Sequence, residues 1–96
     1  MAIEPSPQFL YHGTHVEFEP GDIVNPVSFR HAFATSRPDL AEEHGPNVYQ
    51  VEPVDADEAK TYTDKFNSEV RIPLSEDRRA TVKSQKGFRV IKRHDG

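Results

Sequence analysis

The segment Tyr11-His12-Gly13-Thr14 is the most distinctive group of chemically capable residues in the chain. It follows an apolar run that begins at Phe9, so it would stand at the end of a strand. Because glycine has no Cβ, a flat ligand can approach the backbone closely, and the N–H and C=O groups there can pair with a carboxamide. The imidazole of His12 can hydrogen-bond a sugar hydroxyl. On these four residues alone, however, a histidine that pins a glycine turn is the better interpretation.

Two later segments carry further candidates. Ala32-Phe33-Ala34-Thr35-Ser36 places an aromatic ring before small and hydroxyl residues, which suits one wall of a slot for a planar ring. The alternative is a core strand whose Ser36 caps the next helix. Glu69 lies in the alternating segment 66–74, where a carboxylate on a rigid strand could accept a hydrogen bond from a ribose and favour positive charge developing nearby. The alternative is an exposed ion pair with Arg71, which contributes little.

Short strands joined by turns are the elements that must position these residues. Alternation and apolar runs predict strands at 9–12, 31–35, 48–52, 66–74 and 87–92. Of these, 66–74 has the cleanest alternation of apolar and polar positions. Glu19-Pro20-Gly21-Asp22 is a turn signal, since proline suits the second position of a turn and glycine accepts a positive φ. We read 54–65 as a loop with at most one helical turn, and 75–86 as a charged connection.

Residues 36–45 predict a short helix. Ser36 can cap it, and Asp39 three residues later completes a capping box. Pro38 is tolerated in the first turn, and Gly45 would provide a left-handed exit. Strands with one good helix indicate a small α+β or mostly-β protein.

Composition bounds the function further. Ninety-six residues make one domain, with residues 1–8 expected as a loose leader and 93–96 as a frayed tail. The chain has no cysteine, which excludes disulfides, thiolate metal sites and a cysteine nucleophile. His12 and His15 have no partner at a spacing that completes a zinc site, so no metal is expected.

The net charge of -4 argues against a nucleic-acid binder. No apolar run is long enough to span a membrane and no signal peptide is evident, so the expected compartment is the cytoplasm, with no membrane partner.

Taken in order, these segments resemble the ADP-ribosyltransferase superfamily of the His-Tyr-Glu type. The series is an aromatic-His-Gly-Thr strand end, an aromatic-Ala-Thr-Ser strand that leads to a helix, a Val-Tyr-x-Val-Glu-Pro strand at 48–53, and an alternating strand with a central acid. The nearest group is the small rifamycin ADP-ribosyltransferases (Arr-like), which also open with Tyr-His-Gly-Thr and carry a Val-Glu-Pro. The similarity covers roughly residues 9 to 74.

The resemblance implies an α+β fold with a compact split β-sheet core and one or two short helices, over a single domain of residues 1–96. It also implies an enzyme that uses NAD as co-substrate without a metal, releases nicotinamide and transfers ADP-ribose to a small-molecule or macromolecular acceptor. The residues that it implies for NAD binding are Tyr11, His12, Gly13, Thr14, Phe33 and Ser36.

The resemblance also assigns catalytic roles. His12 would bind the ribose on the nicotinamide side, and Phe33 stands where the family has a tyrosine that stacks on nicotinamide. Glu69 is the candidate acid that orients the ribose and stabilises an oxocarbenium-like transition state. Because the rifamycin-modifying group carries an aspartate upstream of this strand, Asp57 and Asp64 are alternatives for the acid.

Two other functions remain open from the sequence. The first is a catalytically silent module of this fold that binds NAD, ADP-ribose or a protein partner. The second is a tRNA 2′-phosphotransferase, which uses the same nucleotide. That chemistry needs several arginines for the RNA phosphate, and the acidic balance of the chain argues against it.

Overall fold

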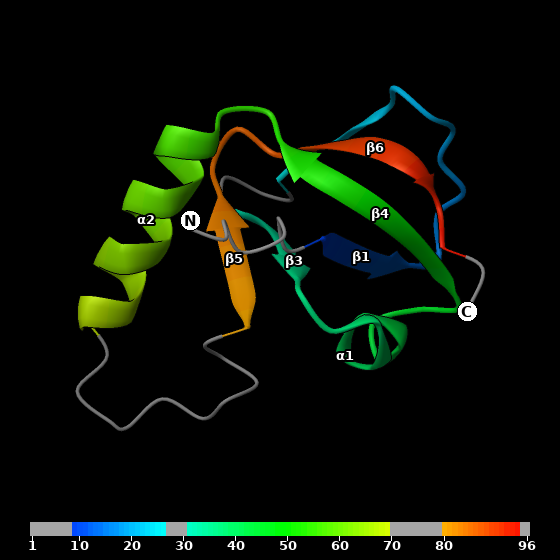
Figure 1. The fold of residues 1–96 in the computed structure, drawn as a ribbon, viewed down its shortest axis with the longest axis horizontal. Coiled ribbons are helices and arrows are strands. Elements are labelled where there is room, and N and C mark those ends of the chain that lie inside the picture. Colours follow the sequence, from blue (N-terminus) through cyan, green and yellow to red (C-terminus); the bar gives the residue numbers. More distant parts are fainter. Residues whose placement is uncertain (1–8, 27–30, 70–79, 95–96) are drawn as a thin grey trace, which may run out of the picture.

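A computed structural model describes residues 9–26, 31–69 and 80–94 of the chain. These residues form a curled six-stranded antiparallel sheet and two helices, which confirms the α+β class (Figure 1). In chain order the elements are β1 (Leu10–Thr14), β2 (Ile23–Val24), β3 (Ala32–Thr35), α1 (Pro38–Glu42), β4 (Asn47–Pro53), α2 (Ala56–Glu69), β5 (Thr81–Ser84) and β6 (Phe88–Arg93).

The strand β1 occupies an interior position in the sheet, whose order is β2-β6-β4-β1-β3-β5. It pairs with β4 at five positions, from Leu10 opposite Val51 to Thr14 opposite Asn47, but with β3 at one position, Tyr11 opposite Thr35. The strand that carries His12 is therefore closely tied to β4 and more loosely tied to β3.

One face of the sheet carries the apolar core. Alternate residues of a strand point to the same face, so the small side chains of β3 and the larger ones of β4 and β6 meet inside the curl. The buried members of this core are Val24, Ala32, Ala34, Tyr49, Val51, Phe88 and Val90, with Leu10, Phe18 and Val82 packed against them. Predicted strands at 9–12, 31–35, 48–52 and 87–92 are thus confirmed as β1, β3, β4 and β6, with small shifts at their ends.

The helix α1 lies where it was predicted, but its ends differ. Arg37 is the N-terminal boundary residue and makes no side-chain cap, so the capping box expected from Ser36 is wrong. Instead the Arg37 guanidinium pairs with Asp39 at 2.7 Å. Gly45 does not have a positive φ either. Gly45 is buried, and a Cβ there would overlap the backbone of Thr14, so close packing requires glycine at this position.

The helix α2 replaces a predicted loop and the start of a predicted strand. Its first turn is closed by Asp55, whose carboxylate accepts a hydrogen bond from the Glu58 N–H at 3.1 Å. The Asp-x-x-Glu spacing after Pro53 is the helix-start signal that our interpretation of 54–65 missed. Residues 66–69, expected to begin a strand, complete this helix, and the rest of that predicted strand, 70–74, lies outside the described residues.

The edge strand β5 also corrects a prediction, because it falls within the charged connection expected at 75–86. It pairs with β3 from Ala32 opposite Ser84 to Thr35 opposite Thr81. Figure 1 shows α2 beside β5 at this end of the sheet. The strand β6 extends to Arg93, and the His94 N–H that follows it donates to the Val48 carbonyl of β4 at 2.8 Å.

Within the residues that the structure describes, neither helix has the length and apolar character needed to cross a membrane.

Candidate functional site

His12 is buried in the sheet, with 8% of its surface exposed. Its Nδ1 atom lies 2.7 Å from the carbonyl oxygen of Phe33 on the neighbouring strand β3. A carbonyl can only accept, so Nδ1 carries the proton, and in the neutral ring Nε2 is then an acceptor. The side chain of His12 thereby bridges β1 and β3 where the backbone pairing of these strands is short.

The charge of His12 follows from this environment. Burial lowers the pKa of the imidazole below its usual value, the hydrogen bond to the Phe33 carbonyl raises it, and His44 lowers it again. Desolvation is the largest of these effects because the ionised ring loses its hydration. The neutral form is thus favoured, with a donor aimed at the backbone and an acceptor available for a hydroxyl.

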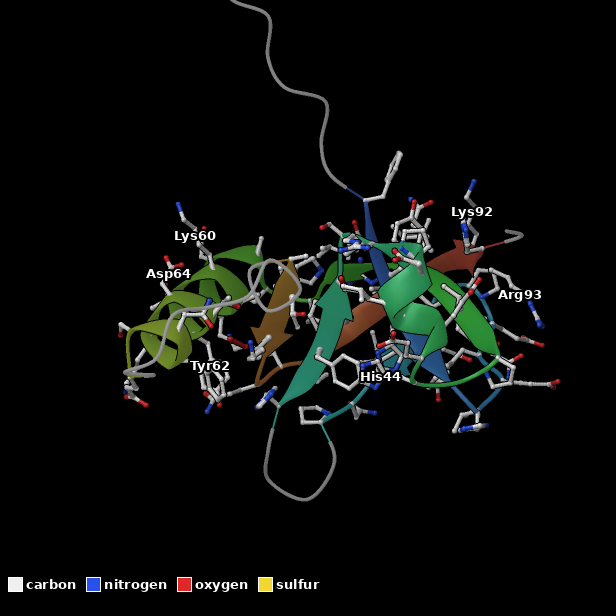
Figure 2. All side chains as sticks on the ribbon, turned by 90° about the horizontal axis from the view of Figure 1, so that it is seen from below. His44, Lys60, Tyr62, Asp64, Lys92 and Arg93 are labelled. Carbon is white, nitrogen blue, oxygen red and sulfur yellow. The ribbon has the colours of Figure 1, made fainter. Side chains whose placement is uncertain are left out.

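Two histidine rings, those of His12 and His44, lie next to the ring of Phe33. The ring centroids of His12 and Phe33 are 5.1 Å apart, and those of Phe33 and His44 are 4.5 Å apart. We call these three side chains the His12 ring cluster. They come from β1, from β3 and from the segment after α1, and Figure 2 shows His44 beneath α1 in that view. The sequence pointed to His12 and Phe33, whereas His44 enters the cluster through the fold alone.

Gly13 has a packing role in the structure. It is buried, and a Cβ at this position would overlap the carbonyl oxygen of Ala41 in α1. The space that the missing side chain leaves is therefore filled by the helix, so the predicted close approach of a flat ligand cannot use that direction. What the glycine provides is a tight contact between α1 and β1, which brings the segment with His44 next to Phe33.

The other residues expected at the site lie around this cluster. The ring of Tyr11 packs edge-on against His94, with centroids 4.9 Å apart. The Thr14 hydroxyl accepts a hydrogen bond from the Val16 N–H at 3.0 Å and so closes the turn after β1. Ser36 is half-buried, and its backbone N–H donates to the Ala80 carbonyl at 3.0 Å.

The candidate acids all belong to α2, which packs on β5 and β4. Glu69 is exposed at the last residue of this helix and does not lie on a strand as predicted. Asp57 is exposed in the first turn and lines a cavity of about 490 Å³. Asp64 lines a smaller cavity of about 270 Å³ whose wall includes Leu10 of β1. None of the three is part of the His12 ring cluster.

A second group of rings lies between α2 and the start of β3. The ring centroid of His31 is 5.7 Å from that of Tyr62 and 5.4 Å from that of Phe66. The Nζ atom of Lys83, on β5, lies 4.6 Å from the centroid of Phe66. We call His31, Tyr62 and Phe66 the α2 ring cluster. The sequence pattern did not reveal this cluster, because it predicted Tyr62 in a loop and Phe66 in a strand and not both on one helix, where residues four apart share a face.

Metal binding has no evident site among the residues described, where no group of three or more His, Asp or Glu side chains could hold an ion. Neither of two comparisons, with models of protein families and with curated proteins, finds a match for this chain.

Proposed function

We propose that this protein binds NAD through the His12 ring cluster and acts as an ADP-ribosyltransferase. The observation that carries the proposal is the meeting of His12, Phe33 and His44, with His12 oriented by a 2.7 Å hydrogen bond to the Phe33 carbonyl. This gives a stacking surface beside an oriented, neutral imidazole. We also propose that the chain has the split-sheet fold of the ADP-ribosyltransferases. The order of the sequence motifs supports this proposal and indicates a ligand that contains nicotinamide and ribose.

In this proposal the nicotinamide ring stacks on Phe33 and the ribose hydroxyl donates to Nε2 of His12. The bond between ribose C1′ and the nicotinamide nitrogen breaks, and its electron pair leaves with nicotinamide. The oxocarbenium-like ribose is then attacked by an acceptor nucleophile, which gives up its proton. Positioning and stabilisation of the developing positive charge are the catalytic effects required.

The acid of this reaction is proposed to come from α2. Glu69 stands seven residues after Tyr62 and three after Phe66, so the three residues share one side of the helix. That side carries the rings of the α2 ring cluster, whereas Asp57 lines a cavity between α2 and the segment at Gln85. Asp64 remains the alternative because it lies near Leu10 of β1.

A catalytically silent NAD- or ADP-ribose-binding module is the second candidate. Two observations favour it. Phe33 has no hydroxyl to hold a polar group of the ligand. The candidate carboxylates lie on α2, which packs against the edge strand β5, and none of them is part of the His12 ring cluster. Such a module would use the same rings for binding without breaking the glycosidic bond.

Nicotinamide release from NAD is the experiment that tests the proposal. Purified protein is incubated with NAD, and free nicotinamide is followed by chromatography. We expect release by the wild type and a loss of at least about 100-fold in His12→Ala, the size typical of a lost catalytic hydrogen-bonding group. His15→Ala is the matched control, because His15 is exposed three residues away.

The outcomes separate the two candidates. Calorimetric binding of NAD that depends on His12 but brings no nicotinamide release would select the silent module. A wild-type protein that binds neither NAD nor ADP-ribose and releases no nicotinamide would exclude both.

A further inference from the structure

Phe33 and His44 of the His12 ring cluster lie on the same face of the sheet as the α2 ring cluster. His31 directly precedes β3 and stands two residues before Phe33, and in an extended chain residues two apart project from the same face, about 7 Å apart. Phe33 is paired with Lys83 on β5, and paired residues of neighbouring strands also share a face. The band therefore runs from His44 through Phe33 and Lys83 to the α2 ring cluster.

Figure 2 agrees with this arrangement. His44 and Tyr62 both lie on the lower side of the molecule in that view, whereas Lys60 and Asp64 project from the opposite side of α2. The core face of β3 carries Ala32 and Ala34 instead, so the band belongs to the other face of the sheet.

The order of chemical groups along the band is ring, cation, ring. At one end are Phe33 and His44, with centroids 4.5 Å apart. Lys83 follows; it has 7% of its surface exposed, and its ammonium lies 4.6 Å from the centroid of the Phe66 ring. At the other end His31, Tyr62 and Phe66 are half-buried, so their edges and faces remain partly accessible. A dinucleotide has the matching order of base, pyrophosphate and base, and aromatic side chains are the usual platform for stacked bases.

We propose that the α2 ring cluster binds the adenosine half of NAD, with Phe66 as the main stacking residue and Lys83 near the pyrophosphate. This inference rests on the proposed function, because it takes the nicotinamide half to lie at the His12 ring cluster. It adds a residue-level assignment for the other half of the ligand. It also gives α2 a part in binding that the sequence did not indicate.

The mechanical link between α2 and β5 supports this assignment. The Thr63 hydroxyl donates to the Lys83 carbonyl at 3.0 Å and accepts from the Lys83 N–H at 2.9 Å. Thr63 neighbours Tyr62 in the sequence, so these bonds fix the position of the α2 ring cluster along β5, next to Lys83 and its paired residue Phe33. A binding surface assembled from two elements needs such a fixed contact.

Binding of three ligands to matched variants tests the proposal. Calorimetry is performed with NAD, with nicotinamide mononucleotide, which lacks adenosine, and with ADP-ribose, which lacks nicotinamide. Phe66→Ala should weaken ADP-ribose and NAD binding by about 10- to 100-fold, the size expected for a lost base stack, and leave nicotinamide mononucleotide binding unchanged. Phe66→Tyr keeps the ring and should bind all three like the wild type. Phe9→Ala is a control at an exposed phenylalanine outside the band.

The other outcomes test separate parts of the proposal. Equal ADP-ribose affinity in Phe66→Ala and wild type would overturn the assignment of Phe66, as would an equal loss for ADP-ribose and nicotinamide mononucleotide. Wild-type binding of nicotinamide mononucleotide without ADP-ribose would overturn the adenosine site and leave the proposed function standing. Binding of ADP-ribose without nicotinamide mononucleotide would support the adenosine site and contradict the nicotinamide site at the His12 ring cluster.

Discussion

His12 is subject to two opposing influences, burial and a hydrogen bond to a backbone carbonyl. The carbonyl of Phe33 would favour an imidazolium, but removal from water disfavours it more, so the pKa of His12 is lowered. A neutral histidine has one donor and one acceptor, and here the donor is used by Phe33. The remaining acceptor is what suits His12 to a ligand hydroxyl, and a protonated ring would lose it.

This lowered pKa predicts that stability falls as the solution becomes acidic. The folded chain holds the His12 proton less tightly than the unfolded chain, whose histidine has a pKa of about 6.5. The contribution of His12 is therefore fully present above about pH 6.5 and is lost as the pH falls through the folded-state pKa. Urea unfolding between about pH 8 and pH 5 measures the effect.

His12→Gln, which cannot titrate, should flatten the acid side of that pH profile relative to the wild type. His15→Gln, at an exposed position, should leave the slope as in the wild type. Parallel profiles for wild type and His12→Gln would contradict the burial argument.

At the scale of elements, the contact between α2 and β5 covers an edge strand of the sheet. β5 is an edge strand, and an unpaired strand edge carries free N–H and C=O groups. The hydroxyl of Thr63 pairs with both groups of Lys83, while the Glu58 carboxylate accepts bonds from the Ser84 hydroxyl at 2.8 Å and the Lys86 N–H at 2.9 Å. The helix thus covers the edge with side-chain hydrogen bonds in place of another strand.

Thr63→Val should therefore destabilise the protein by about 1–3 kcal/mol, because it removes both hydrogen bonds from Thr63 to the buried backbone of Lys83 while keeping the side-chain shape. Amide hydrogen exchange at Lys83 should become faster by a corresponding factor. Thr61→Val is the matched control, since Thr61 is exposed on the same helix and should change stability by less than about 0.5 kcal/mol. Equal effects of the two substitutions would show that the bonds to Lys83 do not hold the edge.

Prediction of the elements from sequence succeeded for β1, β3, β4 and β6 and failed for α2 and β5. The apolar runs at β1, β3, β4 and β6 were visible because each strand buries one face against the core. Residues 66–69 read as part of an alternating strand, yet the helix start at Asp55 extends through them to Glu69. Alternation over the four residues 66–69 is a weak signal for a strand, because it does not show what Phe66 packs against. In the structure Phe66 packs on His31.

At the scale of the whole molecule, both ring clusters depend on the curl of the sheet and on the two helices. α1 brings His44 to Phe33 through the contact between Gly13 and Ala41, and α2 brings Tyr62 and Phe66 to His31. Figure 1 shows these helices at different parts of the sheet, α2 beside β5 and α1 below β1. The proposed ligand would contact residues from both, so it would couple the two ends of the fold.

Such coupling predicts a thermal shift. A ligand present at ten times its dissociation constant stabilises the folded chain by about 1.4 kcal/mol, which raises the Tm of a domain of this size by about 6–11 °C. Differential scanning fluorimetry with NAD measures the shift, and His12→Ala should abolish most of it. A wild-type Tm that does not respond to NAD at any concentration would contradict the proposed function.

The sequence by itself determined the α+β class, four of the strands, the position of α1, and His12 and Phe33 as candidates, because these depend on local patterns of apolar, aromatic and turn residues. Tertiary structure alone decided that His12 bonds the carbonyl of Phe33, and that His44 and the α2 ring cluster lie on the same face as Phe33. These contacts join residues far apart in the chain, and their geometry depends on how strands pair and helices pack. The residue type at each position does not by itself specify which strands pair or how the helices pack.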